Sequence, residues 1–269
     1  VSGRTIEKLM SADTGKVVQA VFRSGDSAAQ EAISKVLMGM EDRAVPAFLD
    51  TVQTATDTAT LESVAGTLSE MAADPLPDIT ARFTADLQPA EAINLVRVVA
   101  LIGREEYAAA LEAPLAGDMP EVRVEAVRAL GRVGGKQAMQ MVLNASADLD
   151  MQVKVAAIRE LANFHDFMAV RRLMELVSPR KKGEVLEDSA VMIAAARSLG
   201  TLKVRQAVES LVEVAIVSRR HVVYPEEVRA AVATALGQIG GPESADTLKR
   251  LLKDSSMLVK STARKALTT

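Results

Sequence analysis

A recurring segment constrains this chain more than any other feature. Its clearest copy is VRVEAVRALGRVG at residues 122–134, in which Leu130 is the central apolar residue. Equivalent apolar anchors recur at steps of 31, 37 or 38 residues: Leu37, Leu68, Val99, Leu130, Leu161, Leu199, Leu236 and Leu267. Eight anchors in one register predict an array of similar units, each stacked on its neighbours.

Each unit has the length of two short helices. One helix of about 13 residues, a turn and a second helix of about 11 residues account for the step. Hydrophobic residues make up 49% of the chain but aromatic residues only 3%, so the core is expected to consist of Ala, Val, Leu, Ile and Met. Such a composition favours closely packed helices over a sheet. The sequence therefore predicts an all-α fold of about seven to eight stacked helical pairs.

Two further features recur around the segment. A small residue follows the anchor in four consecutive copies: Gly131, Ala162, Gly200 and Gly237. Because glycine inside a helix costs about 0.5–1 kcal/mol relative to alanine, we expect it to permit a close approach of the next helix. An aspartate precedes three motif helices, where we expect it to cap the first turn: Asp118, Asp148 and Asp254.

These copies resemble HEAT-type repeats, in particular the short bacterial form D-x-x-V-R-x-x-A-x-x-A-L-G-x-I-G, which also occurs in bilin lyase-like proteins. The resemblance covers the chain from Ala28 onward. It predicts one array over residues 1–269, with divergent repeats in 1–120 and well-matched repeats in 121–269. The family implies a right-handed α-solenoid (an α-α superhelix, armadillo-like), with the motif helices on the concave face. It also implies a series of ion pairs between the aspartate before the motif, as at Asp148 and Asp254, and the basic residue at the second motif position: Arg123, Lys154, Arg229 and Lys260, with Met192 interrupting the series.

A row of arginines occupies one position of the motif helices. The residue six after the motif start is arginine in four consecutive copies: Arg97, Arg128, Arg159 and Arg197. The flanking positions on that helix face are small or polar: Asn94, Ala156, Ala194, Asn163 and Thr201. Guanidinium groups suit the recognition of carboxylates and phosphates. The alternative is an ordinary solvated helix face, on which Arg128 pairs with Glu125.

The two longer steps place insertions in consecutive units, at 178–188 and 218–226. Both insertions are basic: Arg180, Lys181 and Lys182 in the first, Arg219 and Arg220 in the second. Since consecutive units stack side by side, we expect the two loops to be neighbours on one rim, where Tyr224 anchors the second. Such a rim would favour anions, although long loops can also simply be tolerated and solvated.

Most catalytic chemistry lacks support in the sequence. The chain has no cysteine and only two histidines, His165 and His221, so we expect no metal site, no cofactor and no catalytic residue. Nucleotide-binding and hydrolase motifs are absent. No apolar run reaches the length of a membrane span. The first residue is Val rather than Met, which indicates a fragment of a longer protein, and a cytoplasmic location is the default expectation.

The sequence thus predicts a non-catalytic protein-interaction scaffold. Its arginine row and basic rim would bind an acidic segment of a protein or another anionic partner. One alternative is a bilin lyase-like enzyme or chaperone, in which the arginines would meet propionates. Another is a protein that binds the nucleic-acid backbone, which the net charge of −3 argues against. The oligomeric state is not encoded in these features.

Overall fold

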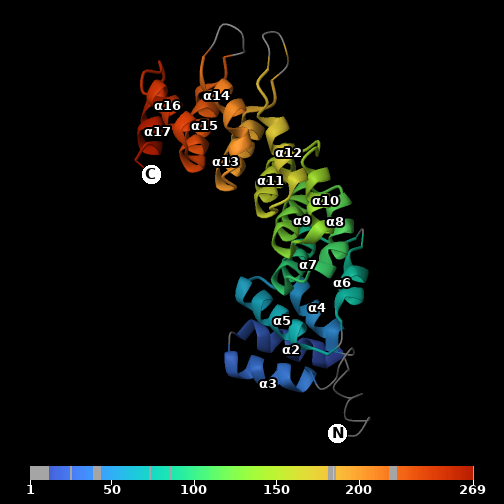
Figure 1. Cartoon of the computed structure of the whole chain (residues 1–269). Coiled ribbons are helices and arrows are strands. Elements are labelled where there is room, and N and C mark those ends of the chain that lie inside the picture. The colour runs from blue at the N-terminus through green and yellow to red at the C-terminus, as the bar shows by residue number, and fades with distance from the viewer. Residues whose placement is uncertain are drawn as a thin grey trace. The chain divides into compact units, whose positions relative to one another are not determined.

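The computed structural model describes residues 12–24, 26–38, 44–72, 74–84, 86–180, 184, 186–217 and 223–268. Within these residues the chain forms helices, turns and loops, and no β-strand occurs (Figure 1). The predicted all-α fold is therefore confirmed. The chain divides into two compact units, Val1–Ala138 and Met139–Thr269, and each is considered by itself.

Unit 1 contains four motif helices that pack in succession: α3 (Ser27–Met38), α5 (Thr58–Glu70), α7 (Pro89–Ile102) and α9 (Pro120–Val133). The helices that precede them form the second layer: α2 (Ala12–Ser24), α4 (Val45–Gln53), α6 (Leu76–Arg82), the 3₁₀ helix η2 (Glu105–Leu111) and α8 (Glu112–Ala116). In that layer, α2 packs on α4, α4 on α6, and α6 on η2. The unit is a ladder of helical pairs, as the repeat register predicts.

Unit 2 repeats the arrangement and begins inside α10 (Gly135–Ala145). Its motif helices also pack in succession: α11 (Met151–Glu160), α13 (Ser189–Thr201), α15 (Glu226–Ile239) and α17 (Met257–Ala266). The first of these, α11, continues directly into the 3₁₀ helix η3 (Leu161–Asn163). The second layer contains α12 (Phe167–Leu176), η4 (Arg205–Ala207), α14 (Val208–Ala215) and α16 (Pro242–Leu251). Figure 1 shows α13, α15 and α17 as neighbours. The stacked-pair architecture is thus present in each unit.

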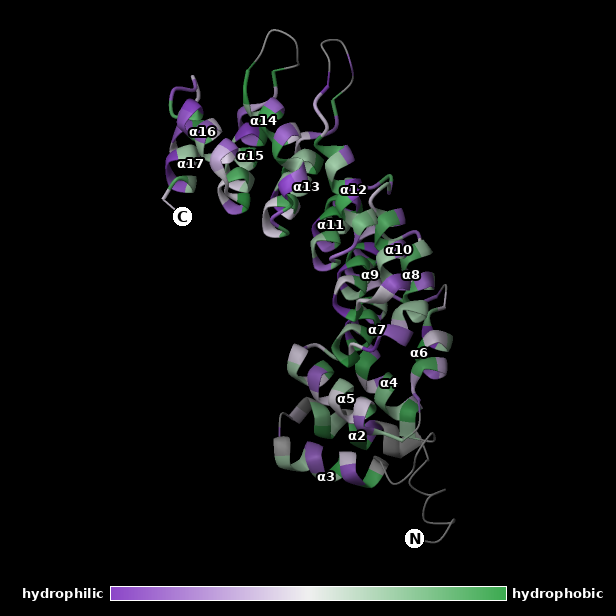
Figure 2. Ribbon diagram, viewed as in Figure 1, coloured by the Kyte–Doolittle hydropathy of each residue, from purple (hydrophilic) through white to green (hydrophobic). Residues whose placement is uncertain are grey.

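The apolar anchors belong to the core of both units, and Figure 2 shows the hydrophobic residues of the helices in green. Six of the eight have no exposed surface: Leu68, Val99, Leu130, Leu161, Leu199 and Leu236. The side chain of Leu37 lies outside the described residues. Leu267 is 37% exposed, because it follows the last residue of α17 and is not covered on both sides. Burial of apolar side chains between successive pairs is the main stabilising contribution.

Glycines after the anchors set the spacing between motif helices in unit 2. A Cβ atom added to Gly200 would lie 2.9 Å from the Cα of Ala235, and one added to Gly237 would lie 2.7 Å from the Cβ of Ala266. Each glycine therefore meets the residue that precedes the next anchor. The predicted close approach is a real feature of both helix contacts.

The predicted aspartate caps are wrong in their position. Asp150, two residues after Asp148, caps α11 by accepting from the N–H groups of Gln152 and Val153 at 2.8 and 3.2 Å. Likewise Ser256, two residues after Asp254, caps α17. Asp118 does not cap α9, whose N-cap residue is Met119. The aspartates instead turn the chain just before the cap, since Asp148 and Asp254 each accept the N–H of the residue two positions later at 2.8 Å.

Because it does not cap the helix, the aspartate before the motif can form the ion pair that the HEAT resemblance implies. Asp254 forms a buried ion pair with Arg229 of the preceding repeat. Arg229 also donates from Nε to the carbonyl oxygen of Tyr224 at 3.2 Å. In unit 1, the corresponding Arg123 donates to the carbonyl oxygen of Gly117 at 3.0 Å. In α9 and α15 the residue at the second motif position therefore ties the motif helix to the loop before it.

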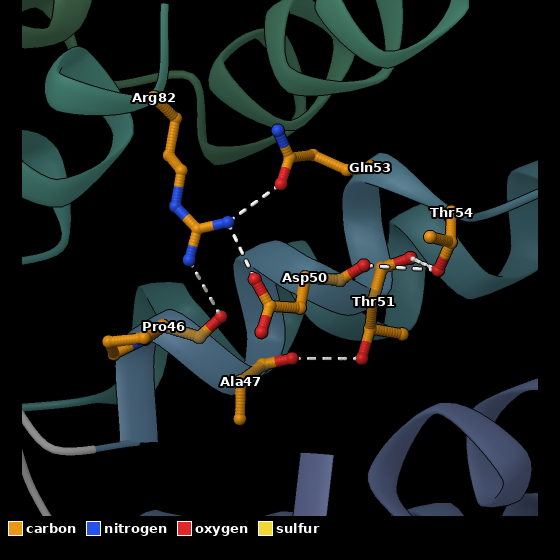
Figure 3. A network of polar contacts seen from close by, with 7 residues as sticks. All are labelled: Pro46, Ala47, Asp50, Thr51, Gln53, Thr54 and Arg82. Atoms are coloured by element: carbon orange, nitrogen blue, oxygen red, sulfur yellow. Dashed lines mark hydrogen bonds and ion pairs between the residues drawn. The ribbon is translucent and has the colours of Figure 1, made fainter. Parts of the chain in front are cut away.

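A polar cluster joins two second-layer helices of unit 1 (Figure 3). Arg82 at the end of α6 reaches α4, where its Nη1 lies 2.6 Å from both the Asp50 Oδ1 and the Gln53 Oε1 atoms. Its Nη2 donates to the carbonyl oxygen of Pro46 at 3.3 Å. One planar guanidinium thus bridges consecutive helical pairs with three bonds.

Candidate partner-binding surfaces

Two of the predicted arginines are brought together in unit 1. The Nε atom of Arg97 on α7 lies 3.0 Å from Glu125 Oε1, and the Nη1 atom of Arg128 on α9 lies 3.3 Å from Glu125 Oε2. Both guanidiniums are about half exposed, whereas the Glu125 side chain is largely buried. One carboxylate therefore binds two arginines of consecutive motif helices. This places them side by side and offsets part of their charge.

The other two arginines occupy the same helical position in unit 2. Arg159 on α11 and Arg197 on α13 are both exposed. The residues next to them lock the two helices together, because the Ser198 hydroxyl donates to the carbonyl oxygen of Ile158 at 3.1 Å. Among the described residues, no carboxylate forms an ion pair with Arg159 or Arg197. This pair has its charge available to a ligand.

The predicted flanking positions of the arginines are only partly open. Asn94, Ala156 and Ala194 are buried, while Asn163 and Thr201 are exposed. Asn94 turns into the helix layer, where its amide donates to the carbonyl oxygens of Val52 and Ala55 at 3.1 and 2.9 Å. The prediction of an open surface at Asn94 is wrong, because its side-chain amide is buried and donates hydrogen bonds to carbonyl oxygens at the end of α4.

The two basic loops of the predicted rim lie only in part within the described residues. Lys181, Lys182, Arg219 and Arg220 lie outside the described residues, as does His221. The two ends that are described do meet, since the backbone N–H of Arg180 donates to the Tyr224 hydroxyl at 2.7 Å. Tyr224 is buried, which agrees with its predicted role as a loop anchor.

Sequence reasoning missed a third surface, at the edge of unit 2 where α12 begins and α13 ends. A groove of about 610 Å³ lies there between His165, Phe167, Val170, Met174, Leu202 and Lys203. We call it the α12–α13 groove. One signal in the sequence could have revealed this groove. Lys203 stands four residues after its anchor, at the position where three other motif segments have glycine: Gly103, Gly134 and Gly240.

In the described part of the chain, no group of three or more His, Asp or Glu residues is placed to hold a metal ion. None of its helices combines the length and the apolar character that crossing a bilayer demands.

Comparison with known proteins identifies the repeat. Residues 184–268 match the family model described as HEAT repeats, and residues 122–148 match the model described as the PBS lyase HEAT-like repeat. No curated protein sequence matches the chain.

Solved structures with a similar arrangement include human deoxyhypusine hydroxylase in complex with glycerol. It is 17% identical, with coverage of 97% of this chain and 98% of that one and a TM-score of 0.40. Two engineered proteins are each 21% identical, with TM-scores of 0.42 and 0.40. They cover 98% and 83% of this chain, and 80% and 95% of their own.

The structure and the family matches together define the class of the protein. It is an all-α protein built from stacked helical pairs, with exposed cationic side chains on its motif helices. More particularly, the chain carries HEAT-type repeats, as its motif residues predict.

Proposed function

We propose that this protein is a non-catalytic interaction scaffold whose motif helices bind an acidic segment of a protein partner. The observation that carries the proposal is the Arg159/Arg197 pair: two exposed guanidiniums at one position of adjoining helices, without an ion-pair partner among the described residues. Like charges so placed repel one another unless a ligand offsets them. A ligand with several carboxylates can bind both through charge-assisted hydrogen bonds.

The repeat architecture supports the same function. Each HEAT-type helical pair exposes one residue at a given helical position, so a ligand in an extended conformation can contact successive helical pairs. In unit 1 the Arg97 and Arg128 side chains already show this geometry, because one carboxylate reaches both. Glu125 therefore occupies the position that a carboxylate of the partner takes at Arg159 and Arg197.

The test uses a fluorescein-labelled peptide of alternating Glu and Gly, with binding measured by fluorescence polarisation. The double variant Arg159→Ala/Arg197→Ala should bind it about ten-fold or more weakly, since two charge-assisted bonds are lost. The control Arg205→Ala/Arg250→Ala makes the same charge change on exposed residues of the second layer of unit 2. Equal loss in both double variants, or no loss in the first, would refute the proposal.

The match to the PBS lyase HEAT-like repeat at residues 122–148 supports one other function, that of a bilin lyase-like enzyme or chaperone. Propionates of a tetrapyrrole would then meet the arginines. Retention of pigment by the purified protein after co-expression with a bilin-producing system would favour this function over the scaffold. Competition by single-stranded DNA that exceeds competition by the acidic peptide would instead indicate binding of a nucleic-acid backbone.

A further inference from the structure

We propose that the α12–α13 groove is a second docking site, which takes a short acidic segment of a protein partner and seats one of its apolar side chains beside Phe167. The site is separate from the Arg159/Arg197 pair and does not depend on it. Three features of the groove favour this occupant: an exposed aromatic side chain, an apolar lining, and a lysine in an uncommon backbone conformation.

Phe167 differs from the other aromatic residues of the chain. Phe167 is 73% exposed, whereas Phe83 is only partly exposed and the other five aromatic residues are buried: Phe22, Phe48, Tyr107, Phe164 and Tyr224. It is the first residue of α12, fixed there because Asp166 caps the helix by accepting the N–H of Met168 at 2.7 Å. The neighbouring Met168 is also exposed. An exposed aromatic and a methionine at a fixed helix start are typical of interaction surfaces.

The groove continues from this pair of apolar side chains along α12. Val170 and Met174 line one side, and Leu202 lines the other at the end of α13. Its volume of about 610 Å³ is large enough for an apolar side chain and its flanking backbone. Because Phe167 in the groove is largely exposed and the exposed Met168 follows it in the chain, a segment of chain can cover both residues more completely than a compact small molecule does.

Lys203, on the cationic edge of the groove, has a backbone conformation that is uncommon for a residue other than glycine. Among the described residues it is the only non-glycine with a positive φ, at 53°. At the comparable position after α7, Gly103 is left-handed with φ 67° and ψ 23°, whereas after α9 and α15 Gly134 and Gly240 combine φ of 74° and 72° with ψ of −164° and −166°. An L-residue is disfavoured in this left-handed conformation. The turn alone is thus better served by glycine, and a lysine side chain there adds a cation to the groove.

The charges around the groove favour an acidic occupant. His165, Arg171 and Lys203 line it, together with Asp166. The Asp166 carboxylate is engaged at the N-terminus of α12, where the helix dipole offsets it. The Nε atom of Arg171 lies 3.4 Å from Glu175 Oε1, so part of the charge of Arg171 is also offset. No carboxylate in the described part of the chain forms an ion pair with Lys203. Lys203 therefore has its charge available for a carboxylate next to the apolar anchor.

The test uses three labelled peptides and the whole chain. The first peptide has a Leu and a Phe flanked on each side by two Asp; in the second, Asn replaces Asp; in the third, Ala replaces Leu and Phe. We expect the first to bind most tightly, by about ten-fold over each of the others. In ¹⁵N-labelled protein, its binding should shift the amide resonances of residues 165–174 and 202–206.

Variants separate this site from the motif-helix surface. Lys203→Gly keeps the turn and removes the cation, so it should weaken the first peptide about ten-fold without loss of helix content by circular dichroism. Phe167→Ser should weaken binding of the first peptide by a similar factor. Lys203→Arg, which keeps the cation, should retain binding. The control Lys253→Gly, in an exposed turn after α16, should leave the affinity for the first peptide unchanged. The double variant Arg159→Ala/Arg197→Ala should also retain binding.

Three results would overturn the inference. One is equal binding of the three peptides. Another is unchanged binding by both Lys203→Gly and Phe167→Ser. The third is a groove that binds laurate, an apolar carboxylate without a peptide backbone, but not the first peptide.

Discussion

The backbone N–H of Arg180 donates a 2.7 Å hydrogen bond to the hydroxyl of Tyr224, and this bond joins the loops of two consecutive repeats. The connection continues through the carbonyl oxygen of Tyr224 to Arg229 and from there to Asp254. Three loops on one rim of unit 2 are thus linked by buried polar groups. Buried groups of this kind stabilise a fold only while each has its partner.

The variant Tyr224→Phe should therefore loosen the base of the first loop. It removes the acceptor of the Arg180 N–H and should lower the stability of unit 2 by about 1 kcal/mol. The direct measurement is amide hydrogen exchange at Arg180, which should become about ten-fold faster. Tyr107→Phe is the matched control, since the hydroxyl of Tyr107 is bound to Asp74 in unit 1 at 2.6 Å. If both variants change Arg180 exchange equally, the hydrogen bond is not what protects that amide.

The buried ion pair between Arg229 and Asp254 should be strongly coupled. Replacing Arg229 by Met leaves the Asp254 carboxylate buried without its cation, so we expect a loss of about 3–5 kcal/mol in unit 2. The double variant Arg229→Met/Asp254→Leu should lose clearly less than the sum of the single variants, because it leaves no isolated charge. Urea denaturation followed by circular dichroism measures all four proteins. Additive losses would mean that the two side chains do not stabilise each other.

A comparison of two glycines tests the close packing of the motif helices. Gly200→Ala should destabilise unit 2 by about 1–3 kcal/mol, because the new Cβ would lie 2.9 Å from the Cα of Ala235. Gly66→Ala on α5 has no atom within 4 Å of its added Cβ. It should therefore be neutral or stabilise unit 1 by up to about 1 kcal/mol, through the higher helix propensity of alanine. Thermal unfolding of the two variants should move in opposite directions, and a similar loss in both would contradict the packing argument.

The repeat register made the fold predictable from the sequence. Anchors such as Leu130 and Leu199 recur because every unit buries the same position, and Gly200 and Gly237 follow them because the next helix comes close. The aspartates were harder to interpret, since Asp148 and Asp150 both precede the motif helix and either can cap it. The structure assigns the cap to the second of the two.

The candidate surfaces were less predictable than the fold. The position of Arg97 and Arg128 followed from the register, but the way in which Glu125 reaches both depends on side-chain conformations that a repeat pattern does not encode. The α12–α13 groove had no repeat signature, because Phe167 and Lys203 each occur in a single unit. Lys203 is detectable in retrospect only as a departure from the glycine that follows α7, α9 and α15.

The partial neutralisation of Arg97 and Arg128 leads to a test in which a substitution should improve binding. Glu125→Gln keeps the size and polar character of the side chain but removes the negative charge between the two guanidiniums. If the motif helices of unit 1 belong to the binding surface, the peptide of alternating Glu and Gly should bind about three- to ten-fold more tightly, because both cations become available to it. Glu121→Gln makes the same charge change at an exposed position in the first turn of the same helix and should have a smaller effect. The gain should disappear when Arg97→Ala and Arg128→Ala are added, as measured by fluorescence polarisation at constant ionic strength. An unchanged affinity of the Glu125→Gln protein would confine the proposed binding surface to Arg159 and Arg197, and would leave Glu125 as a structural bridge between α7 and α9.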